Sequence, residues 1–283
     1  MAFRKSSAIS LSRPNWAVYG ALVAVLVGSL FPLYYTLLIG SGDSSTVTDP
    51  NLSFWPGGNF LSNASAVISN PAVNFWKALG NSIIVSTTVG LSTVILSTLA
   101  GFAFAKLRFK GSGPMFAAVI GTMVVPVQLG VVPLYILMSK FGWTGSLGAV
   151  ILPALVTAFG VFWMTQYLQQ SLPTELIEAA RVDGCNLLRT FWYIAVPAAR
   201  PAAAMLFLFT FVAAWNNFLW PLIILDQSNP TLPLALSLLQ ANFFVDYSLV
   251  LAGVMLATIP LLLLFIFAGR QLVSGIMAGA VKG

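Results

Sequence analysis

The chain has 283 residues, of which 58% are hydrophobic and only 7% charged, and this composition excludes an ordinary soluble globular protein. With no histidine and one cysteine, the chain lacks the residues for a metal cage built on His or Cys clusters, a catalytic histidine or an intrachain disulfide. The formal net charge of +6 comes from basic residues scattered among apolar runs, so we interpret it as membrane topology and expect no nucleic-acid partner.

Six segments are long, apolar and free of charge, as a helix that crosses the hydrocarbon core must be. The first follows a short segment at 1–15 and is longer than the apolar core of a signal peptide, so we interpret it as an uncleaved anchor. Two other charge-free segments, 50–76 and 227–245, contain Asn-Pro turns and are excluded as spans. The predicted spans are 16–39, 80–103, 114–137, 147–168, 202–225 and 248–268.

The basic residues divide unevenly between the loops that these spans would separate. Alternating the loops places eleven of the thirteen Lys and Arg residues on one side and leaves Lys77 and Lys140 on the other. Loops rich in Lys and Arg face the cytoplasm. The sequence therefore predicts an all-α polytopic membrane protein with a transmembrane domain at 16–268, a cytoplasmic tail at 269–283 and both termini cytoplasmic.

The predicted spans contain hydroxyl and amide side chains but no Asp, Glu, Lys, Arg or His. Four hydroxyls of the second span fall within about 60° of one another around the helix, which fits helix packing or, less commonly, a polar pathway. The amides must face protein or water, because an unpaired amide in hydrocarbon costs roughly 2 to 7 kcal/mol. Such an uncharged lining suits a neutral, hydroxyl-rich solute. The candidate pathway residues are Ser82, Ser86, Thr93, Ser97, Gln128, Gln166, Asn216 and Asn217.

The sequence contains no G-x-x-x-x-G-K-[ST] loop, so the chain has no recognisable way to bind ATP. The lack of acidic, basic and histidine side chains in the spans disfavours a proton-coupled carrier. Three functions stay open: a transport subunit driven by another protein, a self-contained facilitator or sodium-coupled carrier, and a membrane scaffold without a transport role. A carrier should show an internal repeat between its halves, and none is visible here.

The longest predicted cytoplasmic loop, 169–201, carries helix signals. Pro173 and the acid in the turn after it predict the start of a helix, and Gly184 predicts its end in a left-handed conformation. A second short helix is expected at 187–194, before two prolines lead back to the membrane. These features fit an amphipathic helix at the membrane surface as well as a docking surface for a partner.

This loop resembles the EAA signature of permease subunits of binding-protein-dependent ATP-binding cassette (ABC) importers. Six of the seven specified positions match, and Val196 stands where the pattern usually has Leu. The matching residues are Glu178, Ala179, Ala180, Gly184, Ile194 and Pro197. Together with segments 81–84, 101–106, 215–221 and 278–283, the signature makes the chain similar to carbohydrate importers of the maltose-transporter type, specifically to the smaller of their two permeases.

The resemblance implies a type I ABC importer permease fold in the bacterial cytoplasmic (inner) membrane and a sugar substrate, a mono-, di- or oligosaccharide. It implies a heterodimer with a second permease, two copies of a cytoplasmic ATPase and an extracytoplasmic substrate-binding protein. ATP and Mg would bind to the ATPase, so this chain would hold no cofactor and catalyse no reaction. The residues implied to couple to the ATPase are Glu178, Ala179, Ala180, Asp183, Gly184, Ile194 and Pro197, with tail contacts from Ala280, Val281, Lys282 and Gly283.

Overall fold

The computed structural model describes residues 15–45, 54–241 and 244–280, with side chains described as far as residue 267. In this part of the chain the regular structure is entirely helical. Five helices are long and apolar enough to cross a membrane, or six if one sharply bent pair counts as a span. The predicted all-α membrane fold is therefore confirmed.

In chain order the helices are α1 (Trp16–Gly40), α2 (Phe60–Ser69), α3 (Phe75–Lys106), α4 (Ser112–Thr122), η1 (Val127–Gly130), α5 (Val131–Lys140), α6 (Leu147–Ile151), η2 (Leu152–Ala154), α7 (Ala158–Ser171), α8 (Thr174–Val182), α9 (Leu187–Thr190), η3 (Phe191–Ala195), α10 (Val196–Trp215), α11 (Leu219–Ile224), α12 (Leu232–Ser237), η4 (Leu238–Gln240) and α13 (Tyr247–Ala280). Of the η segments, η3 is a π-helix and the others are 3-10 helices.

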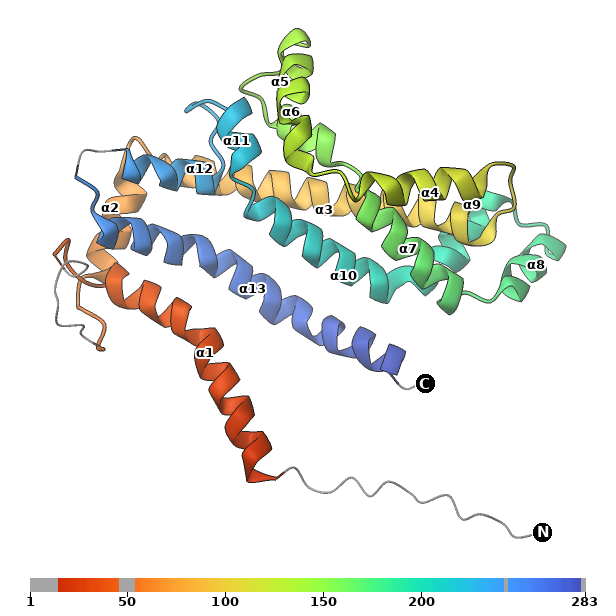
Figure 1. Cartoon of the computed structure of the whole chain (residues 1–283), viewed down its shortest axis with the longest axis horizontal. Helices are drawn as coiled ribbons and strands as arrows, with labels where there is room; N and C mark the ends of the chain where they lie inside the picture. The colour runs from red at the N-terminus through yellow and green to blue at the C-terminus, as the bar shows by residue number, and fades with distance from the viewer. Residues whose placement is uncertain (1–14, 46–53, 242–243, 281–283) are drawn as a thin grey trace.

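The long helix α3 forms the centre of the bundle and packs against α7 and α10, while α13 packs on α10 and on the end of α1 (Figure 1). Glycines permit close approach between the backbones of these helices. A Cβ atom on Gly101 of α3 would lie 2.8 Å from the Cβ of Met164 on α7, and one on Gly40 of α1 would lie 2.9 Å from the backbone N of Ala252 on α13. Close contact through small residues is the usual way in which membrane helices associate.

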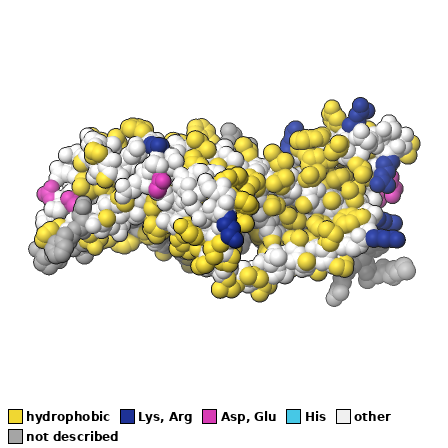
Figure 2. All heavy atoms as spheres, turned by 90° about the horizontal axis from the view of Figure 1, so that it is seen from above, with side chains coloured by type: hydrophobic (Ala, Val, Ile, Leu, Met, Phe, Trp, Pro, Cys, Tyr) yellow, Lys and Arg dark blue, Asp and Glu magenta, His cyan; other side chains and the backbone are white. Residues whose placement is uncertain are grey.

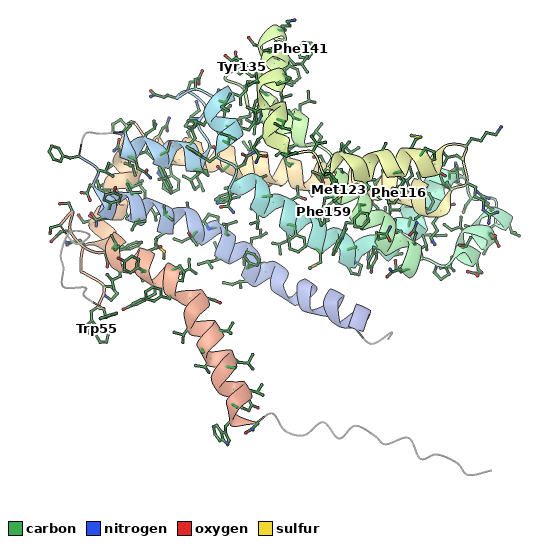
Figure 3. All side chains as sticks on the ribbon, in the orientation of Figure 1. Trp55, Phe116, Met123, Tyr135, Phe141 and Phe159 are labelled. Carbon is green, nitrogen blue, oxygen red and sulfur yellow. The ribbon has the colours of Figure 1, made fainter. Side chains whose placement is uncertain are left out.

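The third predicted span, 114–137, is not a continuous helix. Helix α4 ends at Thr122, and the helical segment Val127–Lys140 continues at an angle of 91°. Pro126 lies in the break and has no N–H to donate, so a straight helix would lose a backbone hydrogen bond there. As a result α5 stands away from the bundle, with Tyr135 and Phe141 on this arm and Phe116 on the packed half (Figure 3).

The fifth span begins earlier than the predicted 202–225. A continuous helical path runs from Leu187 to Trp215, because the π-helix η3 joins α9 to α10. The prolines expected to mark the membrane entry instead lie in α10, Pro197 in its first turn and Pro201 inside it. After Trp215 the helix breaks, and α11 follows as a separate six-residue segment.

Apart from the first two residues of α3, the described parts of the two segments excluded as spans contain only short helices. Helix α2 has ten residues and α12 has six, too few to cross a membrane. Helix α12 nevertheless folds back onto the bundle, because the backbone N–H of Leu232 donates to Ser82 Oγ at 2.7 Å and Asn81 Nδ2 donates to the Pro230 carbonyl at 2.9 Å. Lys and Arg side chains gather at the opposite end, around α8 and α9 (Figure 2).

Candidate functional site

All but one of the residues that match the EAA signature lie in a helical projection at one end of the bundle, which we call the knob (residues 174–195). Helix α8 follows Pro173, which has the extended backbone of a residue that precedes a helix, and Glu175 lies in its first turn. An acid in the first turn interacts favourably with the positive end of the helix dipole. In the structure the helix therefore begins where the sequence predicts, directly after Pro173.

Helix α8 ends in a complete Schellman motif centred on Gly184. The φ angle of Gly184 is 78°, in the left-handed region that favours glycine. The backbone N–H of Cys185 donates to the Ala180 carbonyl at 2.9 Å, and the N–H of Gly184 donates to the Arg181 carbonyl at 3.1 Å. This pairing explains the spacing of the motif, because the final alanine of Glu-Ala-Ala supplies the acceptor and the glycine supplies the turn.

One face of the knob is anchored in a hydrophobic cluster at the end of the bundle. Ile177 is 3% exposed and packs in the same cluster as Leu168 of α7 and Phe102 of α3. The rings of Phe102 and Phe191 lie 5.8 Å apart, which ties the π-helix to α3. Residues of three spans, α3, α7 and α10, thus share this cluster with the knob.

The opposite face of the knob is exposed and carries both charged and apolar side chains. Glu178, Ala179 and Asp183 are exposed, whereas Ala180 is buried beneath them. Several large apolar side chains share this exposure, with Val182 at 88% and Tyr193 at 78%. The others are Leu176, Leu187, Leu188 and Trp192. The sequence analysis does not single out these apolar residues, although all six lie in the helical segments α8, α9 and η3 that carry the motif.

The last two signature residues lie where the knob joins α10. Ile194 is half-buried and packs against the hydrophobic cluster, and Pro197 is exposed in the first turn of α10. Between α9 and α10 the backbone widens into a π-turn, in which the N–H of Val196 donates to the Phe191 carbonyl. Such turns inside helices often mark functional sites. The structure thus places six of the seven predicted coupling residues in the knob and the seventh, Pro197, beside it in the first turn of α10.

The four hydroxyls predicted on one face of α3 are buried against neighbouring helices. Ser82 accepts the Leu232 N–H, and Thr93 Oγ1 donates to the Ala154 carbonyl at 3.2 Å. The hydroxyls of Ser86 and Ser97 are buried without a hydrogen-bond partner among the described residues. Their burial favours helix packing over a pathway lining for this face of the chain.

The predicted pathway amides occupy more open positions. Gln128 is exposed in η1, at the bend between α4 and α5. Asn216 and Asn217 are exposed at the break between α10 and α11, and Asn216 Nδ2 donates to the Val212 carbonyl at 3.0 Å. Gln166 is half-buried on α7. Three of the four amides thus lie at interruptions of membrane-spanning helices.

The structure gives no side-chain geometry for the C-terminal residues that are predicted to contact the ATPases. Ala280 is the last residue of α13, and Val281, Lys282 and Gly283 lie outside the described residues. Their predicted contact with the ATPases stays a prediction.

Comparisons with known proteins support the family resemblance. The sequence profile of the family described as "Binding-protein-dependent transport system inner membrane component" matches residues 94–274, more than half of the chain. The chain is 33% identical over 273 residues to the arabinooligosaccharides transport system permease protein AraQ of Halalkalibacterium halodurans, covering 95% of this chain and 97% of that protein. It is 34% identical to the lactose transport system permease protein LacG of Rhizobium radiobacter, with the same coverage.

A solved structure shares the fold. It is a crystal structure of a bacterial ABC transporter involved in the import of the acidic polysaccharide alginate. The match has a TM-score of 0.74 and covers 90% of this chain and 96% of that chain, at 22% sequence identity. The type I importer fold implied by the signature is therefore consistent with the observed arrangement of helices.

Proposed function

This chain belongs to the family of binding-protein-dependent transport system inner membrane components, and from that membership we propose how it works as the permease subunit of a sugar ABC importer. Such permeases are non-enzymatic inner-membrane subunits of systems that use a binding protein. We infer that a separate ATPase, bound with ATP and Mg, supplies the energy, since this sequence contains no phosphate-binding loop.

The observation that carries the coupling proposal is the construction of the knob. It is pinned to three spans on one side and exposes a mixed charged and apolar surface on the other. A rigid projection of this kind can transmit a displacement, whereas a loose amphipathic helix would slide on the membrane surface. We assign Glu178, Ala179, Asp183 and Gly184 to the surface that enters a cleft of the ATPase, and Ile194 and Pro197 to the joint with α10.

The two interrupted spans support a pathway shared with another subunit. Non-helical backbone at membrane depth cannot face lipid, because its N–H and C=O groups would stay unpaired there. The bend near Gln128 and the break at Asn216 and Asn217 must therefore face protein or water. We propose that a second permease completes this surface and that the sugar passes between the two subunits.

Reconstitution tests the proposed function. Proteoliposomes that contain this chain, its partner permease and the ATPase should accumulate sugar only when ATP and the binding protein are both present. The purified chain alone should neither hydrolyse ATP nor accumulate sugar under a proton or sodium gradient. Gradient-driven uptake by the chain alone would overturn the importer assignment and restore the self-contained carrier.

A further inference from the structure

A pocket of about 390 Å³ lies beside the break in the fifth span, where α10, α12, η4 and α13 converge at the end of the bundle opposite the knob (Figure 1). Its apolar side is formed by residues that include Val254 of α13 and Phe218 from the break. Its polar side is formed by Asn216, Ser237, Gln240 and Thr258. The volume falls within the range of pockets that hold small ligands.

The polar groups of this pocket keep hydrogen-bonding capacity that the chain itself does not use. Ser237 Oγ donates to the Leu234 carbonyl at 2.7 Å and Thr258 Oγ1 donates to the Val254 carbonyl at 2.8 Å, so both oxygens retain lone pairs. Asn216 uses its amide nitrogen on Val212, which leaves its carbonyl oxygen available. The Gln240 carboxamide makes no hydrogen bond within the described residues.

The pocket is acceptor-rich and contains no charged side chain. The acid on the loop that leads to α12, Asp226, lies outside it, and hydrogen bonds from Ser228 hold the pKa of Asp226 below its usual value. A phosphorylated or acidic solute would find no cation to pair with among the side chains that line this pocket. A neutral sugar has donor hydroxyls for the acceptors and apolar C–H faces for Phe218 and Val254.

We propose that this pocket is a subsite for a neutral saccharide, contributed by this permease at the mouth of the pathway. The assignment rests on the proposed function, since it requires that the chain carries sugar. It extends that function in two ways. It names Ser237, Gln240 and Thr258, which lie outside the predicted pathway residues, and it excludes acidic sugars such as the alginate carried by the transporter of shared fold.

Cysteine accessibility tests the site directly. In a Cys185→Ser background, Ser237→Cys in the reconstituted importer should react with a hydrophilic thiol reagent. Lactose, maltose or arabinotriose should slow this reaction, and an alginate trisaccharide should not. No reaction at all would mean that lipid or the partner permease fills the pocket. Reaction without protection by any of the three neutral sugars would also overturn the proposal, as would equal protection by the acidic one.

Transport by a second variant separates this proposal from the function on which it rests. Gln240→Ala should lower the rate of uptake at saturating binding protein by about 3- to 10-fold, the effect of one lost neutral hydrogen bond. Gln170→Ala, an exposed amide at the knob end of α7, is the matched control and should leave the rate unchanged. Normal uptake by Gln240→Ala would refute the subsite alone. Absence of ATP-dependent sugar uptake by the wild-type importer would refute the proposed function.

Discussion

Substitution of Gly184 provides the sharpest test of the knob, because the structure separates two effects of a larger side chain, a steric clash within the chain and strain in the backbone. A Cβ atom on Gly184 would have no neighbour within 4 Å, so a larger side chain meets no clash inside this chain. The φ angle of 78° nevertheless disfavours a β-branched residue. Gly184→Val should therefore cost about 1 to 3 kcal/mol in local strain.

The chain can relieve this strain by unwinding the end of α8. Unwinding would break the hydrogen bonds that Cys185 and Gly184 donate to the Ala180 and Arg181 carbonyls and would displace the exposed surface around Asp183. Ile177 would remain anchored in its cluster, so the membrane-spanning helices should stay folded. If the strain reaches the docking surface, about 1 to 2 kcal/mol corresponds to a roughly 5- to 30-fold weaker association with the ATPase.

The assay is recovery of the ATPase with the tagged permease, measured beside ATP-driven sugar uptake. Gly184→Val should lower both while leaving the membrane abundance of the chain unchanged. Gly184→Asn is the matched control, since Asn tolerates the left-handed conformation although it also adds a side chain. A similar loss in both variants would point to a steric conflict in the ATPase cleft. Wild-type recovery and uptake by Gly184→Val would refute the docking assignment.

Two further predictions concern the charge and the topology of the molecule. Glu178→Lys reverses a charge on the exposed face of the knob, so it should weaken ATPase recovery more mildly than Gly184→Val, without loss of protein from the membrane; unchanged recovery would remove Glu178 from the interface. Reporter fusions near Gly58 and Ser228 should read external and fusions after Lys110 cytoplasmic, because the basic residues favour that orientation; a cytoplasmic signal near Ser228 would contradict the predicted topology.

Features set by local chemistry could be predicted from the sequence. Charge-free apolar length indicates membrane spans because burying charge in lipid is costly, and Gly184 indicates a helix end because few other residues adopt its conformation. The resemblance to the EAA signature then indicated the candidate coupling residues. Helix α8 has the boundaries that its start and stop signals indicate.

Features set by distant contacts could not be predicted in this way. Nothing near Ser82 indicates that its hydroxyl would accept the N–H of Leu232, a residue 150 positions away. The same contact holds α12 against α3 and so helps to place Ser237 and Gln240 in the pocket. The sequence analysis does not include these two residues among the pathway candidates, because they belong to a segment excluded as a span. The only local feature that could have indicated the pocket is the uncharged amide of Gln240 in this segment.

The sequence analysis also does not predict the π-turn at the knob, because it ends the short helix before the prolines next to the membrane. The ring of a proline inside a helix clashes with the carbonyl four residues earlier, here that of Tyr193. We interpret the wider turn of η3, in which the N–H of Val196 donates to the Phe191 carbonyl, as the way in which the helix accommodates this ring. The helix can therefore continue from the knob into α10 without interruption.

This geometry leads to a prediction about Pro197. Pro197→Ala removes the clash and restores an N–H, so it should favour a regular α-helix over the π-turn and rotate the knob relative to α10. ATPase recovery should then change little, because the docking surface is intact, while sugar uptake per ATP hydrolysed should fall several-fold. Pro201→Ala, four residues further along α10 and outside the π-turn, is the matched control and should retain coupling. Full coupling in Pro197→Ala would show that the π-turn accommodates the proline without setting the orientation of the knob.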